Sequence, residues 1–363
     1  MLHPRRHGGR DSVDVGGSGL TPGEARVSSL ITRILFATDF SSCSEEALHY
    51  ALLWGKVCKA QVECISVLPI HHHLDVEGAI LQMYIDEQRK IIRPKLQALA
   101  DYIEEISGSC VSHEQAGIPH ATICQVAGEI GADLIVMGTH GWSGIDRVLL
   151  GSTAERVVAQ APCPVLTVKT TSPEGKILSY PTTEEVGKSR AHPPPFERCS
   201  PHHVVVAVDF SDCSQDAVEY AFYIAKEFEV NITLVHVEEL PSYSLDFNLT
   251  YFETQKEQRL RAEKRLKELC GVFESKGISA TPVVKAPPVP DAIIETIREN
   301  KANLLVMGTH GRTGLSRLFM GSVASTLLRK ASIPVLTVHA GKFSHDHPRR
   351  HVKTEHAAPQ TNE

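Results

Sequence analysis

Short apolar runs alternate along the chain with longer segments whose apolar residues recur every three or four positions. Residues 31–38 and 61–68 are apolar runs of strand length, and residues 42–56 between them have helical spacing. Strands separated by helices in this way indicate βαβ units, a parallel sheet and helices on both of its faces. The same alternation predicts further strands near 109–115, 133–137 and 164–169, and helices over 79–107, over 119–130 and from 151.

The whole pattern occurs twice. Gly138-Thr139-His140-Gly141 recurs 170 positions later as Gly308-Thr309-His310-Gly311, and Gly151-Ser152 recurs as Gly321-Ser322 at the same offset. A constant offset predicts two copies of one domain. We expect domains at 30–170 and 200–340, a linker at 171–199, and disordered segments at 1–29 and 341–363.

Composition narrows the class of protein. The chain has 363 residues, of which 42% are hydrophobic and 22% charged, as in ordinary globular proteins. The net charge of −6 argues against a nucleic-acid partner. Nine cysteines without a C-x-x-C pair favour reduced thiols, and no apolar run is long enough for a membrane span, so we expect a cytoplasmic protein.

The repeated glycines suggest an anion site. An apolar strand runs directly into Gly138, and ligands of open α/β sheets bind beyond the carboxyl ends of the strands. If strands one and four are neighbours, Asp39 faces the segment from Gly138 to Gly141. Glycines there could take positive φ, and the helix opening at Gly151-Ser152 would offer free N–H groups to phosphate. The alternative is that the glycines serve only tight turns and close packing. No P-loop lysine follows them.

The motif G-x-x-G, nine residues, G-[ST], after a strand that ends in Val-Met, resembles the ATP-binding branch of the universal stress protein family, and the doubling resembles its tandem two-domain members. The resemblance implies two tandem Rossmann-like (adenine nucleotide alpha hydrolase-like) domains, each with a five-stranded parallel sheet. It implies ATP or another adenine nucleotide as ligand, with or without Mg²⁺. The nucleotide-binding residues that it implies are Ala37, Asp39, Val67, Met137, Gly138, His140, Gly141, Gly151, Ser152 and Thr153 in the first copy, and Ala207, Asp209, Val237, Met307, Gly308, His310, Gly311, Gly321, Ser322 and Val323 in the second.

The two copies differ after the third strand. The first copy has Gly117-Ile118-Pro119, as the family does, whereas the second has Pro287-Pro288-Val289-Pro290. Proline fixes φ and lacks an N–H donor, so this loop cannot present the same backbone face in the second copy, and the first site is the better supported of the two. Two of the implied nucleotide-binding positions also depart from the family, which often has proline where this chain has Ala37 and Ala207.

Several side chains have two readings. His140 and His310 could act as a base or metal ligand, or could border the nucleotide. Asp39 and Asp209 could contact Mg²⁺, or could serve as loop aspartates at a strand exit.

The cysteines and the histidine-rich segments are also ambiguous. Cys43 and Cys213 lie near the start of a helix, where the dipole could lower a thiol pKa for redox sensing, but burial as small apolar residues is the alternative. Residues 71–73 and the histidines at 345–356 could scavenge metal or could simply be solvated.

The sequence therefore favours a regulatory or stress-response protein that binds adenine nucleotide twice, more a binding protein than an enzyme. A slow ATPase or phosphoryl-transfer enzyme, or an interaction scaffold without ligand, are the alternatives. The fifth strands, 164–169 and 334–339, would lie at apolar sheet edges, so we expect the copies to pair through them within one chain. A homodimer would then use other surfaces. The sequence leaves open which nucleotide binds, whether it is hydrolysed, and which signal and partner are involved.

Overall fold

The computed structural model describes residues 30–70, 78–140, 150–170, 196–238, 249–311 and 320–341. The expected N-terminal arm, nearly all of the expected linker and tail, the histidines at 71–73 and 345–356, and Gly141 lie outside the described residues.

The first copy alternates strands and helices as the apolar pattern predicted. Most of its elements begin or end within one or two residues of the expected bounds, and the third strand begins three residues later than expected. In chain order they are β1 (Arg33–Ala37), α1 (Ser42–Cys58), β2 (Gln61–Pro69), α2 (Gly78–Ser107), β3 (Ser112–Gly117), α3 (Pro119–Glu129), β4 (Leu134–Gly138), α4 (Ser152–Gln160) and β5 (Val165–Val168).

The second copy repeats this order after one additional short helix. Its elements are α6 (Phe196–Cys199), β6 (His203–Ala207), α7 (Asp212–Phe228), β7 (Asn231–Val237), α8 (Leu249–Glu274), β8 (Ala280–Lys285), α9 (Val289–Glu299), β9 (Leu304–Gly308), α10 (Ser322–Lys330) and β10 (Val335–Val338). The helix α6 corrects our expectation of a solvated linker as far as residue 199, because its Cys199 is buried and the helix packs on α1.

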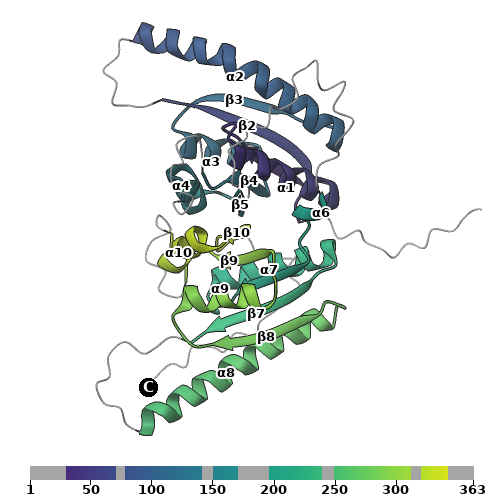
Figure 1. The fold of residues 1–363 in the computed structure, drawn as a ribbon, viewed down its shortest axis with the longest axis vertical. Helices are drawn as coiled ribbons and strands as arrows, with labels where there is room; N and C mark the ends of the chain where they lie inside the picture. Colours follow the sequence, from purple (N-terminus) through teal and green to yellow (C-terminus); the bar gives the residue numbers. More distant parts are fainter. Residues whose placement is uncertain are drawn as a thin grey trace, which may run out of the picture.

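The ten strands of the described residues form one continuous sheet, in the order β3-β2-β1-β4-β5-β10-β9-β6-β7-β8. Within each copy neighbouring strands are parallel, and β5 pairs with β10 antiparallel, with Leu166 opposite Leu336. The predicted pairing of the fifth strands is therefore confirmed. Figure 1 shows the two copies stacked along the long axis, with β5 and β10 meeting between them.

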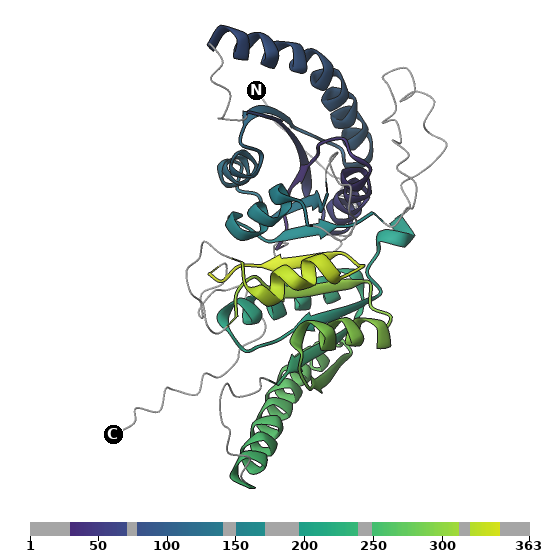
Figure 2. The ribbon, with the colours of Figure 1, turned by 60° about the vertical axis from the view of Figure 1, so that its left-hand side comes forward.

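Helices cover both faces of this sheet, and each covering layer continues across the junction (Figure 2). One face packs against α1, α2, α7 and α8 in a single apolar cluster, and the other packs against α3, α4, α9 and α10. Trp54 of α1 contacts Phe228 at the end of α7, with ring centroids 5.4 Å apart. The two copies thus share a core as well as a sheet.

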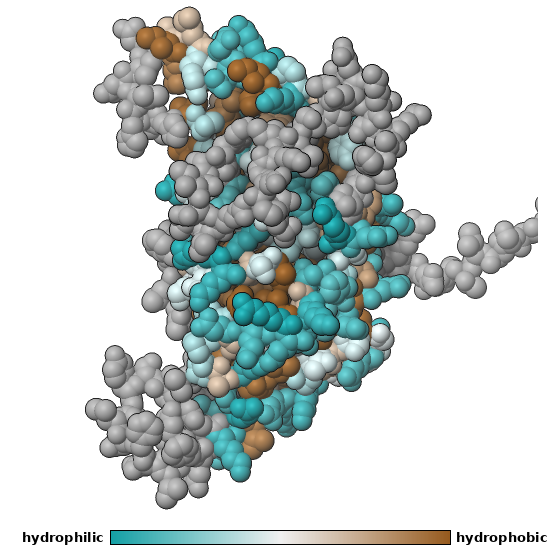
Figure 3. All heavy atoms as spheres, in the orientation of Figure 1, coloured by the Kyte–Doolittle hydropathy of each residue, from teal (hydrophilic) through white to brown (hydrophobic). Residues whose placement is uncertain are grey.

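The long helices α2 and α8 extend beyond the body of the sheet at opposite ends (Figure 1). Apolar residues gather over the upper end of α2 (Figure 3), where Ile80 and Met83 are exposed. Among the described helices, none combines the length and apolarity that crossing a bilayer requires.

Candidate functional site

The predicted crevice lies where β1 and β4 end side by side. Ala37 is paired with Met137 at the last rungs of these strands, so the chain leaves both strands at the same edge of the sheet. The connections then diverge, because β2 lies beyond β1 and β5 lies beyond β4. The expected neighbourhood of strands one and four is confirmed, and β6 and β9 repeat it in the second copy.

Hydrogen bonds of Thr139 join the end of β4 to the end of β5 and to the start of α4. The N–H of Thr139 donates to Val168 O at 2.9 Å, and the carbonyl of Thr139 accepts the N–H of Gly151 at 2.8 Å. The chain therefore returns to the end of β4 before it starts α4. Thr309 makes the same two hydrogen bonds in the second copy, each at 2.9 Å, to Val338 O and from Gly321 N–H.

The start of α1 closes the same crevice from the other side. Ser41 caps α1 by accepting the N–H of Ser44, and its hydroxyl also lies 3.4 Å from His140 O. Ser211 caps α7 in the same way and lies 3.4 Å from His310 O. Ser41, Thr139 and their second-copy equivalents were absent from the expected site, although the repeat contains them in Asp-Phe-Ser and Gly-Thr-His-Gly.

The helices α4 and α10 supply the expected anion-binding end. Gly151 is the N-cap of α4 and Gly321 the N-cap of α10, and neither helix has a side chain that caps its first turn. The N–H groups of the first turn are free of intrahelical acceptors and lie at the positive end of the helix dipole. Ser152 is exposed beside them, so its hydroxyl is available to a ligand. These groups can bind phosphate oxygens.

The structure corrects the expected backbone conformation of one glycine. Gly138 is not among the residues with positive φ, and a Cβ there would lie 2.9 Å from the backbone of Cys43. Gly138 allows close packing of β4 on α1, which was the alternative interpretation of the motif glycines. Gly308 is similar, since a Cβ would lie 2.7 Å from that of Cys213.

The other glycines of the motif border the crevice itself. A Cβ on Gly151 would lie 2.8 Å from Thr139 O, and one on Gly311 would lie 2.8 Å from Oδ2 of Asp209. Asp209 thus faces the glycine segment, as expected for a residue at the exit of the first strand. Asp39 and Asp209 each accept the N–H of the serine two residues on, at 3.0 and 2.9 Å, which fits the loop-aspartate reading.

Apolar residues at the strand ends form the other part of the crevice. Ala37 and Met137 are buried and Val67 is half-buried, and all three belong to the cluster on the α3 and α4 face. Ala207, Val237 and Met307 have equivalent places in the second copy. Apolar side chains of this kind suit the flat apolar faces of a purine ring.

The two histidines of the motif are held by their neighbours. Nδ1 of His140 lies 2.8 Å from Oγ1 of Thr139, and His310 lies 2.9 Å from Thr309 in the same way. Burial lowers the pKa of His140, and the positive charge of Lys169 lowers it further. In each ring Nε2 is buried and has no hydrogen-bond partner among the described residues. A bound ligand could satisfy this nitrogen.

The motif cysteines behave as buried residues. Cys43 and Cys213 are buried, and Sγ of Cys43 lies 3.2 Å from Val168 O. Burial raises the pKa of the Cys213 thiol, which favours the interpretation as a buried apolar residue over that of a redox sensor at this position.

Known proteins resemble both copies of the chain. The Universal stress protein family matches residues 31–169 and residues 201–339. The chain belongs to the universal stress protein family. It is 36% identical over 145 residues to Universal stress protein MJ0531 of Methanocaldococcus jannaschii, which covers 39% of this chain and 84% of that protein.

Relatives with both copies are also known. Universal stress protein Rv2005c of Mycobacterium tuberculosis is 27% identical over 258 residues, which is 69% of this chain and 76% of that protein. The crystal structure of a universal stress protein from Archaeoglobus fulgidus shares the fold, with a TM-score of 0.57 and 22% identity over 85% of this chain and 97% of that one. The tandem arrangement and the α/β fold expected from the sequence are thereby confirmed.

Among the described residues, the two crevices of this universal stress protein differ at several positions. Thr153 of the first is replaced by Val323 in the second, which removes one hydroxyl beside the helix start. Where the chain leaves the third strand of each copy, the first copy has Gly117-Ile118 and the second has Pro287-Pro288. Lys169, at the end of β5, lies near His140, whereas the second copy has His339 near His310, with ring centroids 6.3 Å apart.

Proposed function

We propose that this universal stress protein binds an adenine nucleotide in each of its two crevices and acts as a regulatory protein in the stress response. The purine would lie on the apolar residues at the ends of β1, β2 and β4. Its phosphates would reach the first turn of α4, and the second copy would use β6, β7, β9 and α10 in the same way.

One observation carries the proposal. The hydrogen bond from Gly151 to Thr139 holds the uncapped start of α4 at the end of β4, and Gly321 and Thr309 repeat it. Bare N–H groups next to a glycine-bordered strand exit suit an anionic ligand, and both copies keep them. The unpartnered Nε2 atoms of His140 and His310 add one further polar group to each crevice.

If Mg²⁺ accompanies the phosphates, Asp39 and Asp209, at the exits of the first strands, would supply its carboxylate ligands. Hard cations prefer such oxygen ligands, and a cation would neutralise phosphate charge. Each aspartate accepts the N–H of the serine two residues on, which fixes its carboxylate at the strand exit.

The copies should bind with different affinity. The first crevice has the hydroxyl of Thr153, the ammonium group of Lys169 near His140, and the N–H donors of Gly117 and Ile118. The second has Val323, His339 and two prolines at the corresponding positions. We therefore expect the first site to bind the nucleotide more tightly.

A charge placed at the helix start tests the phosphate site. Ser152→Asp puts a carboxylate at the first residue of α4, where the helix dipole favours it, so the fold should be kept. The same carboxylate should repel phosphate, and we expect ATP affinity at the first site to fall at least about tenfold, or about 1.4 kcal/mol. Ser152→Asn is the matched uncharged control, and Ser322→Asp is the corresponding change in the second copy.

The assay is calorimetric titration of the full chain with ATP and Mg²⁺, repeated with AMP and with cyclic AMP to identify the preferred nucleotide. Heat stabilisation by millimolar ATP provides a second readout. Binding that is equal in Ser152→Asp and Ser152→Asn would place the phosphates elsewhere. No binding of any adenine nucleotide to the unchanged protein would refute the proposal.

A further inference from the structure

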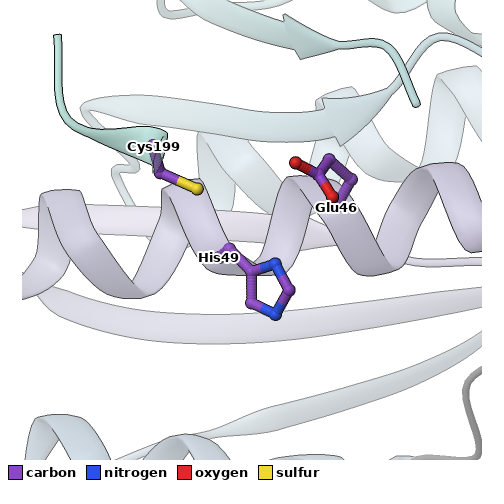
Figure 4. A group of neighbouring side chains, drawn as sticks. All are labelled: Glu46, His49 and Cys199. Carbon is purple, nitrogen blue, oxygen red and sulfur yellow. The ribbon is translucent and has the colours of Figure 1, made fainter. Parts of the chain in front are cut away.

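A second group of polar side chains lies outside the nucleotide crevice, where the connecting segment joins the second copy. Glu46 and His49 project from α1, three residues apart, and Cys199 ends the short helix α6. Each offers one ligand atom, and these three atoms all lie within 4.8 Å of one another. In Figure 4 the thiol of Cys199 points toward the helix that carries the other two side chains.

The imidazole is in a state that suits a metal. Burial lowers the pKa of His49, and the positive charge of Arg198 lowers it further, which favours the neutral ring. Its Nδ1 is buried without a hydrogen-bond partner among the described residues. A buried ring nitrogen without a partner is costly, and a bound metal ion would satisfy it.

We propose that Glu46, His49 and Cys199 bind one divalent transition-metal ion, with zinc as the natural candidate, and that the ion fastens the end of the connecting segment to the first copy. A thiolate, an imidazole and a carboxylate together match the ligands that zinc takes. Three protein ligands leave the fourth tetrahedral position to water.

Only a small closure would be needed. With bonds of about 2.0–2.3 Å, ligand atoms of a tetrahedral zinc site lie roughly 3.5 Å apart. The present separations of up to 4.8 Å can shorten by rotation of the Glu46 and His49 side chains, which are only half-buried. That partial exposure also gives the ion a path from solvent.

The charges of Glu46, Arg198 and the Cys199 thiolate affect how tightly the metal ion binds. Burial raises the pKa of the Cys199 thiol to about 12, and the charge of Glu46 raises it further, so the ion must displace the thiol proton. Arg198 opposes a cation, while the carboxylate and the thiolate together balance the two charges of the ion. The site should therefore bind less tightly than closed sites with four protein ligands.

The second copy shows why this site is not part of the repeat. The positions equivalent to Glu46 and His49 are Asp216 and Glu219, both buried. Oδ2 of Asp216 accepts the N–H of Gly341 at 3.0 Å, so the chain after β10 contacts this carboxylate. Within the described residues, Glu46, His49 and Cys199 form the one group of His, Cys, Asp or Glu side chains close enough together to hold a metal ion.

The apolar contacts of α6 already bring the ligands together. Phe196 packs against the core cluster of α1, and Nζ of Lys56 lies 5.3 Å from the centroid of its ring. A metal ion would add a second attachment at the other end of α6, directly before β6.

Cobalt is the probe that separates this site from the histidine-rich segments. The full chain is stripped with a chelator, kept reduced and titrated with Co²⁺, which gives near-ultraviolet absorption only where a thiolate is a ligand. We expect one equivalent of cobalt to give this absorption, together with the visible bands of a tetrahedral site, and Zn²⁺ to abolish both. Histidines at 345–356 could bind cobalt but would not give thiolate absorption.

Variants locate the site. Cys199→Ser should abolish the thiolate absorption, and His49→Gln and Glu46→Gln should each weaken cobalt binding at least about tenfold. Cys124→Ser, which changes a half-buried thiol on α3, is the matched control and should bind as the unchanged protein does. If Cys199→Ser fails to fold, His49→Gln and Glu46→Gln still decide the question. Absence of thiolate absorption in the unchanged protein, or its survival in Cys199→Ser, would overturn the proposal.

Discussion

The junction between the two copies offers a sharp test of how the chain is held together. Two buried threonines lie across it in equivalent places. Oγ1 of Thr167 donates to Val335 O at 3.1 Å, and Oγ1 of Thr337 donates to Val165 O at 3.2 Å. We predict that the double variant Thr167→Val, Thr337→Val is less stable because it loses both hydrogen bonds and keeps the shape of both side chains.

The magnitude follows from burial. Both threonines are at most 1% exposed, so water cannot replace the lost donors. Removing one partner of a buried hydrogen bond costs about 1–3 kcal/mol, so the double variant should lose about 2–6 kcal/mol of unfolding free energy. The control is Thr326→Val, whose exposed hydroxyl donates to Ser322 O at 2.8 Å, and it should cost less than about 0.5 kcal/mol.

The assay is urea unfolding followed by two signals. Both tryptophans, Trp54 and Trp142, belong to the first copy, and Trp54 packs against Phe228 of the second. Their fluorescence therefore reports the first copy and its contact with the second, whereas circular dichroism reports the whole of both copies. Because the sheet and both apolar layers continue across the junction, the unchanged protein should show one transition at the same urea concentration by both signals. Two separate transitions, or a double variant as stable as Thr326→Val, would refute the reasoning.

Two further predictions use other parts of the chain. Gly151→Ala should lower the free energy of unfolding in urea by about 1–3 kcal/mol, since its Cβ would lie 2.8 Å from Thr139 O. Gly321→Ala should lower it less, because its Cβ would lie 3.2 Å from Thr309 O, and equal losses in the two variants would contradict this comparison. Burial, with Glu46 second, raises the pKa of Glu45 to about 7, so stability is lost as pH rises from the unfolded value near 4.5 through 7. Glu45→Gln should therefore raise the melting temperature at pH 8 and leave it nearly unchanged at pH 4, and a gain of the same size at both values would exclude this cause.

The sequence predicted the fold well because the local and repeated signals agree. Four of the five strands of the first copy are mostly apolar runs, and the constant offset predicted the second copy from the first. The exception is β3, Ser112–Gly117, a polar edge strand whose start was placed three residues too early. The junction followed from the apolar fifth strands, since Val165–Val168 would otherwise form a bare sheet edge. The helix Phe196–Cys199 was missed because four residues give no periodic pattern, and its position depends on packing against α1.

The site could be predicted only in part. Spacing identified the glycines, but the conformation of Gly138 depends on how closely Cys43 of a neighbouring helix approaches, which no local pattern shows. Thr139 and Ser41 act through hydrogen bonds to distant segments, and the repeat alone could have indicated them. The group of Glu46, His49 and Cys199 has no spacing signal at all, because α6 brings Cys199 to α1 only in the folded chain.

Crystallography of the full chain grown with ATP and Mg²⁺ tests the central claim most directly. We predict density for an adenine nucleotide at both strand exits, with phosphate oxygens within hydrogen-bonding distance of the first-turn N–H groups of Ser152 and Ser322, and with higher occupancy in the first copy. Crevices that contain only solvent or side chains at saturating ATP, or a nucleotide bound elsewhere on the molecule, would contradict it.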